Sequence, residues 1–221
     1  MMEGEAAHHL GRVLRAQPGQ LYELSDGTKV WLGRIDTVTR DTVEFSLLEE
    51  IAAFQPALRT TLLLSVVKFD SFEWALEKAT ELGVHSIVPL AAARSEKTLL
   101  HAAEKRSERW KKILLEASQQ SRRVSIPVLT GVEKPSAAFA RASVAKLMLS
   151  ERVGARPMRE ILPANGASQV TLAIGPEGGW TDEEFAAAAS AGFHEAALGN
   201  LILRTETAVI AALAGLNYAL G

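Results

Sequence analysis

The sequence contains no cysteine, and this absence excludes several kinds of chemistry at once. Without thiols the chain can form no disulfide, no thiolate metal site and no cysteine nucleophile. The histidines do not supply a metal centre either, because His8 and His9 are adjacent near the start of the sequence and the others are scattered. We therefore predict that the protein binds no metal.

Long apolar runs are also missing. The longest, such as residues 61–67 and 170–174, are far too short to cross a bilayer. The first residues, MMEGEAAHHLGR, lack the apolar core of a signal peptide, so we expect a soluble, cytoplasmic protein with no membrane partner. Hydrophobic residues still make up 48% of the 221 residues, which is enough for a folded core and excludes a disordered chain.

An overall excess of positive charge is absent too, since the net charge is −2. A nucleic-acid partner would then require local clusters of Lys and Arg. Residues 104–123 contain seven basic and three acidic residues, a local charge of +4. Most such runs are solvated helix surface, but Arg122 and Arg123 follow a polar Ser-Gln-Gln-Ser run that suits RNA sugar, phosphate and base edges. Arg94 and Lys97 form a similar candidate.

The pattern of expected secondary structure changes near Pro56. Before it, three short β-prone runs (20–24, 29–35 and 42–48) are separated by turn signals such as Asp26-Gly27, which favours a hairpin. After it, apolar strands alternate with helices, which predicts an α/β domain with a mainly parallel sheet. We expect a small β-barrel or sheet module over 1–56 and the α/β domain over 57–221.

The elements expected in the second part follow from periodicity and end signals. The helix after the first strand should begin at Asp70, with Glu73 completing a capping box, and should end at Gly83. The expected strands are 61–68, 84–90, 146–150 and 169–174, and the later helices are 102–122, 181–191 and 205–220.

The first segment that could carry chemistry is IGPEGGW (Ile174–Trp180), which joins a buried strand to a helix capped by Thr181 and Glu184. Glycines there would let the backbone approach a ligand at the carboxyl end of a strand. The spacing matches neither the dinucleotide nor the P-loop fingerprint, and three acidic residues occupy the first helical turn, where a phosphate would bind. A ligand without phosphates, such as S-adenosylmethionine, is compatible, and a purely structural turn is the alternative.

The second segment, Leu198–Ala208, delivers Arg204 and Glu206 to the start of the last helix. A cation at a helix N-terminus is electrostatically unfavourable, so Arg204 is a candidate for a functional role. An ion pair of Arg204 with Glu206 or Glu177, without catalytic meaning, is the alternative.

Taken together, these motifs resemble the RsmE family, which methylates N3 of a uridine in the RNA of the small ribosomal subunit. The resemblance rests on five segments that occur in this order: HHLGRVLR (His8–Arg15), RSEKT (Arg94–Thr98), EASQQSRR followed by IP (Glu116–Pro127), IGPEGGWTDEE (Ile174–Glu184) and LGNLILRTETA (Leu198–Ala208). It covers nearly the whole chain.

This resemblance implies a SPOUT α/β fold with a trefoil knot, a mainly parallel sheet with flanking helices and an N-terminal PUA-like β-barrel that binds RNA. It implies S-adenosyl-L-methionine as the cofactor and a homodimer that packs in part through the final helix. The implied cofactor-binding residues come from three segments: Leu149, Ser150 and Glu151; Ile174, Gly175, Pro176, Glu177, Gly178, Gly179 and Trp180; and Leu198, Gly199, Asn200, Leu201, Ile202, Leu203, Arg204 and Thr207.

The implied RNA partner is 16S ribosomal RNA, within the small ribosomal subunit. The residues expected to contact it are Arg12, Arg15, Arg94, Lys97, Arg122 and Arg123. From the unfavourable position of Arg204 at a helix start, we expect Arg204 and Glu206 to be catalytic. Arg204 would stabilise negative charge on the uracil carbonyls, and Glu206 or Glu177 would hold Arg204 or help remove the proton.

The chemistry narrows the reaction independently of the resemblance. Methylation at C5 of uridine usually needs a cysteine that adds at C6, and this chain has none. Attack by a base nitrogen or a ribose oxygen needs no covalent adduct. Another SPOUT methylation, at a ribose 2′-oxygen or another base nitrogen, is therefore an alternative, and so are a non-catalytic RNA-binding protein and a nucleotide-binding oxidoreductase.

Overall fold

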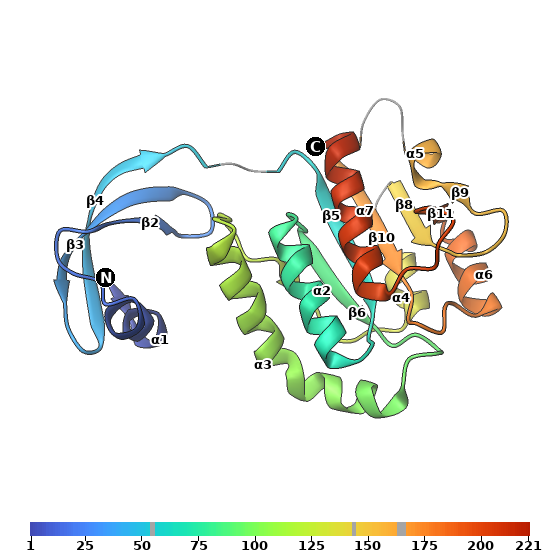
Figure 1. The fold of residues 1–221 in the computed structure, drawn as a ribbon, viewed down its shortest axis with the longest axis horizontal. Helices are drawn as coiled ribbons and strands as arrows, with labels where there is room; N and C mark the ends of the chain where they lie inside the picture. Colours follow the sequence, from blue (N-terminus) through green and yellow to red (C-terminus); the bar gives the residue numbers. More distant parts are fainter. Residues whose placement is uncertain (54–55, 143–144, 163–166) are drawn as a thin grey trace. The chain divides into compact units, whose positions relative to one another are not determined.

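The computed structural model describes residues 1–53, 56–142, 145–162 and 167–221. It divides into two compact units, Met1–Gln55 and Pro56–Gly221, each of which has its own hydrophobic core. Figure 1 shows the path of the chain through both. No helix among the described residues combines the length and the apolar character needed to cross a membrane.

The first unit is a curled, open antiparallel sheet with a short helical segment packed on it. Its strands β1 (Met2–Glu3), β2 (Leu21–Ser25), β3 (Val30–Val38) and β4 (Thr42–Ile51) pair in the order β1-β4-β3-β2. The helix α1 (Gly4–His8) continues into a π-helical turn, η1 (His9–Val13). Ala7 and Leu10 from this segment pack with Ile35 and Val43 of the sheet.

The hairpin predicted at Asp26-Gly27 joins β2 to β3. The Asp26 carboxylate accepts hydrogen bonds from the backbone amides of Thr28 and Lys29, at 2.8 Å each, and from the Thr28 hydroxyl at 2.7 Å. These bonds, the one from the Lys29 amide above all, lower the pKa of Asp26 to about 2. The turn is therefore held by its own side chains.

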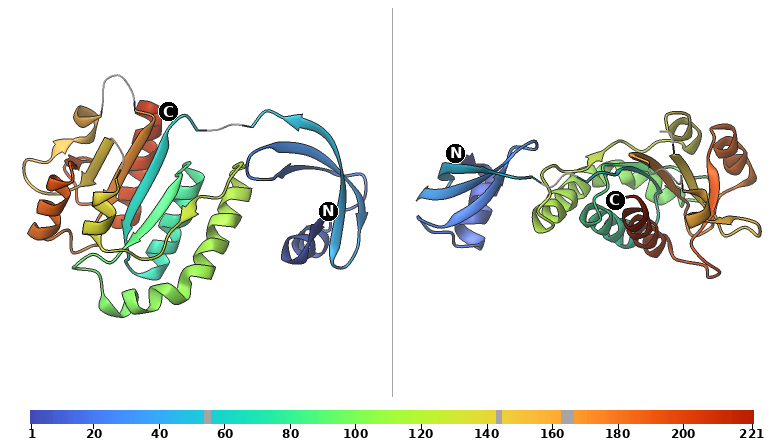
Figure 2. Two further views of the ribbon diagram at one scale, coloured as in Figure 1. Left: turned by 180° about the vertical axis from the view of Figure 1, so that it is seen from behind. Right: turned by 90° about the horizontal axis from the view of Figure 1, so that it is seen from above.

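The second unit is a seven-stranded parallel sheet with helices on both faces, as Figure 2 shows. Its strands are β5 (Arg59–Ser65), β6 (Ser86–Leu90), β7 (Val128–Leu129), β8 (Ala145–Leu149), β9 (Arg156–Pro157), β10 (Gln169–Ile174) and β11 (His194–Ala197). They pair in the order β7-β6-β5-β10-β8-β11-β9.

Helices cover this sheet because its strands are apolar on both faces. Leu62 and Leu64 of β5 belong to the core under α2 (Phe69–Glu81), α3 (Lys97–Gln120) and α7 (Thr205–Leu220), whereas Leu63 points into the core under α4 (Pro135–Ala140) and α6 (Asp182–Ser190). Such alternation follows from the two-residue period of a strand, and burial of both faces is typical of parallel sheets. The predicted mainly parallel sheet with flanking helices is confirmed.

At one end of the sheet, the order of the strands differs from their order along the chain. β11 lies between β8 and β9, although residues 150–155 join those two strands directly. The chain that leaves β11 therefore emerges beside this connection, at the carboxyl edge of the sheet. The short helix α5 (Met158–Ile161) follows β9.

Two local predictions in this unit are wrong. The helix α2 begins at Phe69 with Lys68 as its N-cap, and no side chain caps it, so Asp70 and Glu73 form no capping box. Glu73 is 7% exposed and instead binds Arg106 at 3.1 Å and Arg109 at 2.7 Å, because a buried carboxylate needs partners. The long helix starts at Lys97 rather than at residue 102.

Several short elements were not predicted, namely β7, β9, β11, α4 and α5. β11 has the sequence His-Glu-Ala-Ala, which contains no β-branched or aromatic residue. It is a strand because β8 and β9 supply hydrogen-bonding partners on both sides. Tertiary context decided this element.

Candidate functional site

The site is built at the carboxyl edge of the sheet, where β10, β8 and β11 lie side by side. Because these strands are parallel, the segments that follow them emerge at the same edge. Those segments are the three that carry the sequence motifs: 149–151, 174–180 and 198–204. The structure therefore brings together residues that are about fifty positions apart along the chain.

Hydrogen bonds link the three segments directly. The Trp180 indole Nε1 donates to the carbonyl oxygen of Leu149 at 3.2 Å, and the Thr205 hydroxyl donates to the carbonyl oxygen of Gly175 at 3.2 Å. The amide of Ser150 donates to the carbonyl oxygen of Ala196 at 3.0 Å. These contacts hold the backbone of each segment in place before any ligand binds, which lowers the entropy cost of binding.

The turn after β10 requires glycine because neighbouring residues lie close to its backbone. A Cβ on Gly175 would lie 3.0 Å from Cε2 of Trp180, and a Cβ on Gly178 would lie 3.2 Å from Cβ of Arg94. Gly179 has a φ of +71°, which side chains rarely adopt. The turn is thus packed between Trp180 and Arg94, and its residues Glu177 and Gly178 are exposed.

The helix that follows the turn disfavours a phosphate. The first turn of α6 contains Asp182, Glu183 and Glu184, and the predicted capping box is present: the Thr181 hydroxyl accepts from the Glu184 amide at 3.2 Å, and the Glu184 carboxylate accepts from the Thr181 amide at 2.9 Å. Glu184 also accepts a hydrogen bond from the amide of Ala93 at 2.8 Å. The helix N-terminus is therefore already neutralised, and a cofactor without phosphates fits this site.

The third segment presents apolar side chains to solvent. Leu201 and Ile202 are 82% and 80% exposed, whereas Leu198 and Leu203 on either side pack partly against the core. The buried pair anchors the segment and the exposed pair faces outward. Two adjacent, fully accessible aliphatic residues in an anchored loop provide an apolar surface for a ligand or a partner.

Arg204 is the N-cap of α7 and is exposed. Its guanidinium forms no hydrogen bond or ion pair with any described residue, so neither of the ion pairs left open by the sequence is present. Glu206, two residues further on, is 9% exposed in the first turn of α7. Thr207 beside it is exposed. Arg204 is therefore available to a ligand, while Glu206 lies beneath the surface.

A cavity of about 300 Å³ adjoins the glycine turn. It lies among the segments that follow β5, β6 and β10, and it includes Lys68, Arg94 and Glu177 in its lining. Arg94 donates a hydrogen bond from Nη1 to the carbonyl oxygen of Gly178 at 2.7 Å, so this arginine supports the turn. The second cavity, of about 410 Å³, lies between α6 and residues 152–156.

The other cations proposed to bind RNA differ in how they are held. Arg12 and Arg15 are exposed in the first unit, and Lys97 is exposed at the start of α3. Arg122 is exposed with a φ of +54°. RNA contacts of these residues stay a prediction.

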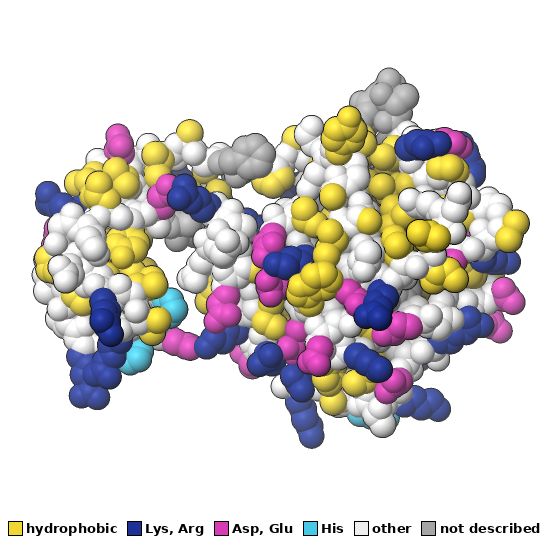
Figure 3. Space-filling view, viewed as in Figure 1, with side chains coloured by type: hydrophobic (Ala, Val, Ile, Leu, Met, Phe, Trp, Pro, Cys, Tyr) yellow, Lys and Arg dark blue, Asp and Glu magenta, His cyan; other side chains and the backbone are white. Residues whose placement is uncertain are grey.

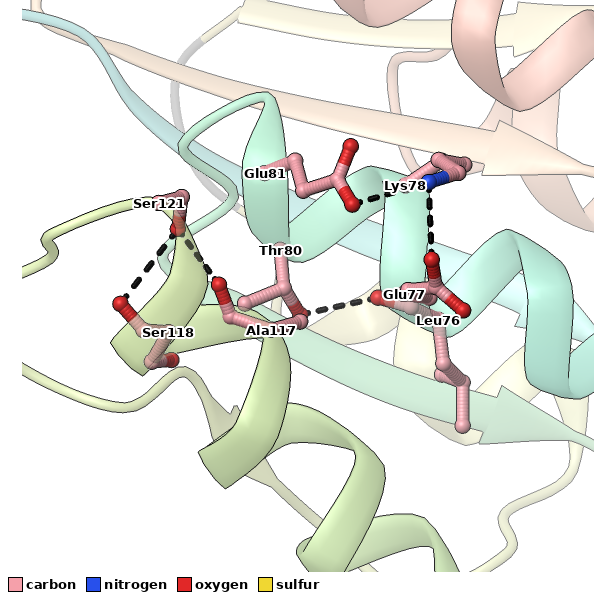
Figure 4. A network of polar contacts seen from close by, with 8 residues as sticks. All are labelled: Leu76, Glu77, Lys78, Thr80, Glu81, Ala117, Ser118 and Ser121. Atoms are coloured by element: carbon pink, nitrogen blue, oxygen red, sulfur yellow. Dashed lines mark hydrogen bonds and ion pairs between the residues drawn. The ribbon is translucent and has the colours of Figure 1, made fainter. Parts of the chain in front are cut away.

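Arg123 has a structural role that the sequence did not reveal. Its guanidinium donates to the carbonyl oxygens of Thr80 at 2.8 Å, Val84 at 2.7 Å and Ser125 at 3.2 Å, and burial lowers its pKa. Figure 4 shows the ends of α2 and α3 nearby, where the hydroxyls of Thr80 and Ser121 donate to helix carbonyls. Arg123 thus ties both helix ends to the amino edge of the sheet.

The basic run on α3 is partly neutralised. Arg106 and Arg109 bind Glu73, and Lys111 binds Glu108 at 2.7 Å. Figure 3 shows basic and acidic side chains interspersed on the face that carries α2, α3 and α7. Much of the local positive charge is therefore ordinary solvated helix surface.

Comparisons with known proteins agree with this geometry. A family model described as an RNA methyltransferase domain matches residues 55–217, and one described as an RNA methyltransferase PUA domain matches residues 3–48. The ribosomal RNA small subunit methyltransferase E of Synechocystis is 37% identical over 220 residues, covering 95% of this chain and 70% of the relative. The Bacillus subtilis enzyme of the same name is 30% identical over 225 residues, covering 97% and 88%.

A solved structure gives the same result in three dimensions. The ribosomal RNA small subunit methyltransferase E from Neisseria gonorrhoeae, bound to S-adenosyl methionine, matches with a TM-score of 0.91 at 31% identity and covers 100% of this chain and 91% of its own. The fold class and the family inferred from the motifs are confirmed. With both units matched in sequence and in structure, this chain belongs to the ribosomal RNA small subunit methyltransferase E family of RNA methyltransferases.

Proposed function

We propose that this protein transfers the methyl group of S-adenosyl-L-methionine to N3 of a uridine in 16S ribosomal RNA. The observation that supports this most is the convergence of 149–151, 174–180 and 198–204 at one edge of the sheet, beside an arginine without a protein partner. Membership of the family supplies the reaction class, and the Neisseria gonorrhoeae relative binds the same cofactor.

The backbone of these three segments would hold the cofactor. The close packing of Gly175 against Trp180 and of Gly178 against Arg94 leaves peptide groups accessible at the turn. Peptide donors and acceptors suit an adenosine and an amino acid, which carry many hydrogen-bonding groups and no phosphate. The exposed side chains of Leu201 and Ile202 would cover the apolar part of the ligand.

The reaction requires a nitrogen anion and in-line attack. The N3 proton leaves to a carboxylate or to solvent, the N3 electron pair bonds to the methyl carbon, and the electron pair of the carbon–sulfur bond remains on sulfur. The positive charge of the sulfonium is thereby neutralised. The protein contributes alignment of the three atoms and stabilisation of negative charge on the uracil carbonyls.

In this proposal Arg204 provides that stabilisation, because its guanidinium is exposed and forms no bond within the described chain. Glu177, which is exposed on the glycine turn, would accept the proton. Glu206 is buried in the first turn of α7 and would orient Arg204 when substrate binds.

We also propose that residues 1–56 bind RNA and 57–221 carry catalysis, and that the enzyme acts in the cytoplasm as a homodimer on the small ribosomal subunit. The homodimer proposal is supported by Tyr218 on the final helix, α7, because this large side chain is 95% exposed and available to a second copy of the chain. The target base must be unstacked to be methylated, which favours a structured RNA or a ribosomal particle as substrate.

The test is methyl transfer from labelled S-adenosylmethionine to small subunits that lack the modification, followed by nucleoside analysis. Labelled 3-methyluridine is the expected product. A ribose-methylated nucleoside or another methylated base would keep the cofactor and overturn the target atom. Absence of both transfer and cofactor binding would instead support a non-catalytic RNA-binding protein.

A further inference from the structure

A second positively charged side chain at the carboxyl edge is unexplained by the cofactor segments. Lys68 is the N-cap of α2, where the helix dipole disfavours a cation, and its side chain caps nothing. The Lys68 ammonium forms no hydrogen bond or ion pair with any described residue. Asp70 lies in the first turn of α2 and suits the helix dipole, but no described side chain binds the Lys68 ammonium, which leaves it available to a ligand.

Lys68 lines the cavity of about 300 Å³ beside the glycine turn. Most of the residues that line this cavity are polar or charged, among them Lys68, Arg94, Ser95, Glu96 and Glu177, whereas the lining residues Val66 and Val67 are themselves buried. Small-molecule sites commonly have volumes of roughly 300–1,000 Å³. The cavity is thus large enough for a single pyrimidine base, and its lining suits a polar one.

The cavity shares Glu177 and Gly178 with the turn proposed to bind the cofactor. A base in the cavity would therefore lie next to the cofactor, on the side formed by the segments after β5 and β6. Arg94 is occupied, because its Nη1 donates to the carbonyl oxygen of Gly178 at 2.7 Å. Lys68 is the lining cation whose donors are all available.

We propose that this cavity receives the unstacked uracil and that the Lys68 ammonium binds a carbonyl oxygen of the base as N3 loses its proton. This inference rests on the proposed function and adds a catalytic residue to it. The N3 proton passes to Glu177 or to solvent, and the negative charge that then spreads onto the carbonyl oxygens is stabilised by Lys68. Arg94 is a positioning residue that keeps the turn at the wall of the cavity.

The proposal assigns a specific effect to Lys68. A cation next to the base lowers the pKa of the uridine N3–H, because an opposite charge favours the ionised form. Removal of the cation should therefore slow methyl transfer most at neutral pH and less at alkaline pH, where uridine ionises without help. Glu96 and Glu177 would raise the pKa of the base, Arg94 and the Arg204 of the proposed function would lower it, and all four are unchanged in the variant.

The experiment measures single-turnover methylation of small subunits against pH for wild type, Lys68→Ala and Lys68→Arg, with Lys105→Ala as the matched control on the exposed surface of α3. We expect Lys68→Ala to be about 100-fold slower at neutral pH, with the deficit shrinking as pH rises. Lys68→Arg should recover much of the rate, and Lys105→Ala should behave as wild type.

Two further measurements separate catalysis from structure. Cofactor affinity by calorimetry should be unchanged in Lys68→Ala, and thermal stability should be equal or higher, because a cation is removed from a helix N-terminus. A wild-type rate at every pH, or an equal loss at every pH accompanied by weaker cofactor binding, would overturn the inference. If wild type itself formed no 3-methyluridine, the proposed function would fail, and this outcome is distinct from a failure of Lys68 alone.

Discussion

The amino and carboxyl edges of the seven-stranded sheet differ in how some of their positively charged side chains are bound. At the amino edge, Arg123 donates to three backbone carbonyls, and Arg59 donates from Nη2 to the Nε2 atom of His85 at 2.6 Å. At the carboxyl edge, Arg94 also donates to a backbone carbonyl, that of Gly178, but the side chains of Arg204 and Lys68 have no partner among the described residues. Arg204 and Lys68 also stand at helix N-termini, where they do not stabilise the helix.

This difference separates structural from functional cations. A guanidinium whose donors are used by buried carbonyls contributes to folding, and its removal leaves those carbonyls unsatisfied. A cation that has no protein partner and an unfavourable position contributes little to folding, so a ligand is the better reason for its presence. Variants at the two edges should therefore affect different measurements.

The largest effect is expected at the carboxyl edge. Arg204→Ala should lower the methylation rate by about 100- to 1,000-fold, the usual loss for one donor that stabilises developing negative charge. The unfolding free energy should change by less than about 0.5 kcal/mol, because the side chain is exposed and unpaired. Arg159→Ala, an exposed arginine on α5, is the control. Near-normal turnover with unchanged RNA binding would refute the role of Arg204.

Arg123→Ala tests the amino edge and should show the reverse pattern. Loss of the donors to Thr80, Val84 and Ser125 should lower the unfolding free energy by about 2 kcal/mol, measured by urea denaturation. Methylation well below the melting temperature should be close to normal. A large loss of RNA binding without destabilisation would show instead that the RNA contact predicted for Arg123 is its main role.

A smaller effect is expected from Trp180→Phe, which removes the donor to the Leu149 carbonyl oxygen. The loss of one such hydrogen bond should cost about 1 kcal/mol in unfolding free energy. Cofactor affinity, measured by calorimetry, should fall because the bond fixes two of the three cofactor segments together. Trp74→Phe is the control, since Trp74 is 44% exposed on α2. Equal effects of both variants on the affinity would contradict this role.

The smallest expected effect is on how stability depends on pH, through His85 at the amino edge. Burial, and then the charges of Arg59 and Arg123, lower the pKa of His85 below its ordinary value of 6.5. The unfolded chain therefore binds a proton at higher pH than the folded chain, so stability should fall as pH decreases from 6.5 through the lowered pKa. His85→Gln should flatten this dependence in denaturation curves recorded from neutral to mildly acidic pH. An unchanged slope would show that His85 is not its source.

The sequence predicted features that depend on neighbouring residues. The strands 61–68, 84–90, 146–150 and 169–174 correspond to β5, β6, β8 and β10, because each is a short apolar run between turn signals. The capping box of Thr181 and Glu184 was also predictable, since its partners are three residues apart. The same spacing of Asp70 and Glu73 led to a wrong prediction, because Glu73 forms ion pairs with Arg106 and Arg109 on another helix.

The motifs indicated where the site lies but not how it is assembled. The glycines of the turn signalled close approach, yet the neighbours that require them, Trp180 and Arg94, are identified only by the fold. Lys68 was missed entirely. Its position just before α2 was one possible signal, the same one that singled out Arg204, but the mistaken helix start at Asp70 concealed it.

By itself the sequence determined the family, the alternation of strands and helices, and the three segments that follow β8, β10 and β11. These properties follow from local sequence patterns and from motifs of fixed spacing. Only the tertiary structure decided the strand order that places these segments together. It also decided which Lys and Arg side chains bind backbone carbonyls and which have no partner among the described residues. The physical reason is that a hydrogen bond or a helix dipole acts over a few ångströms in space, whereas its partners here lie tens of residues apart along the chain.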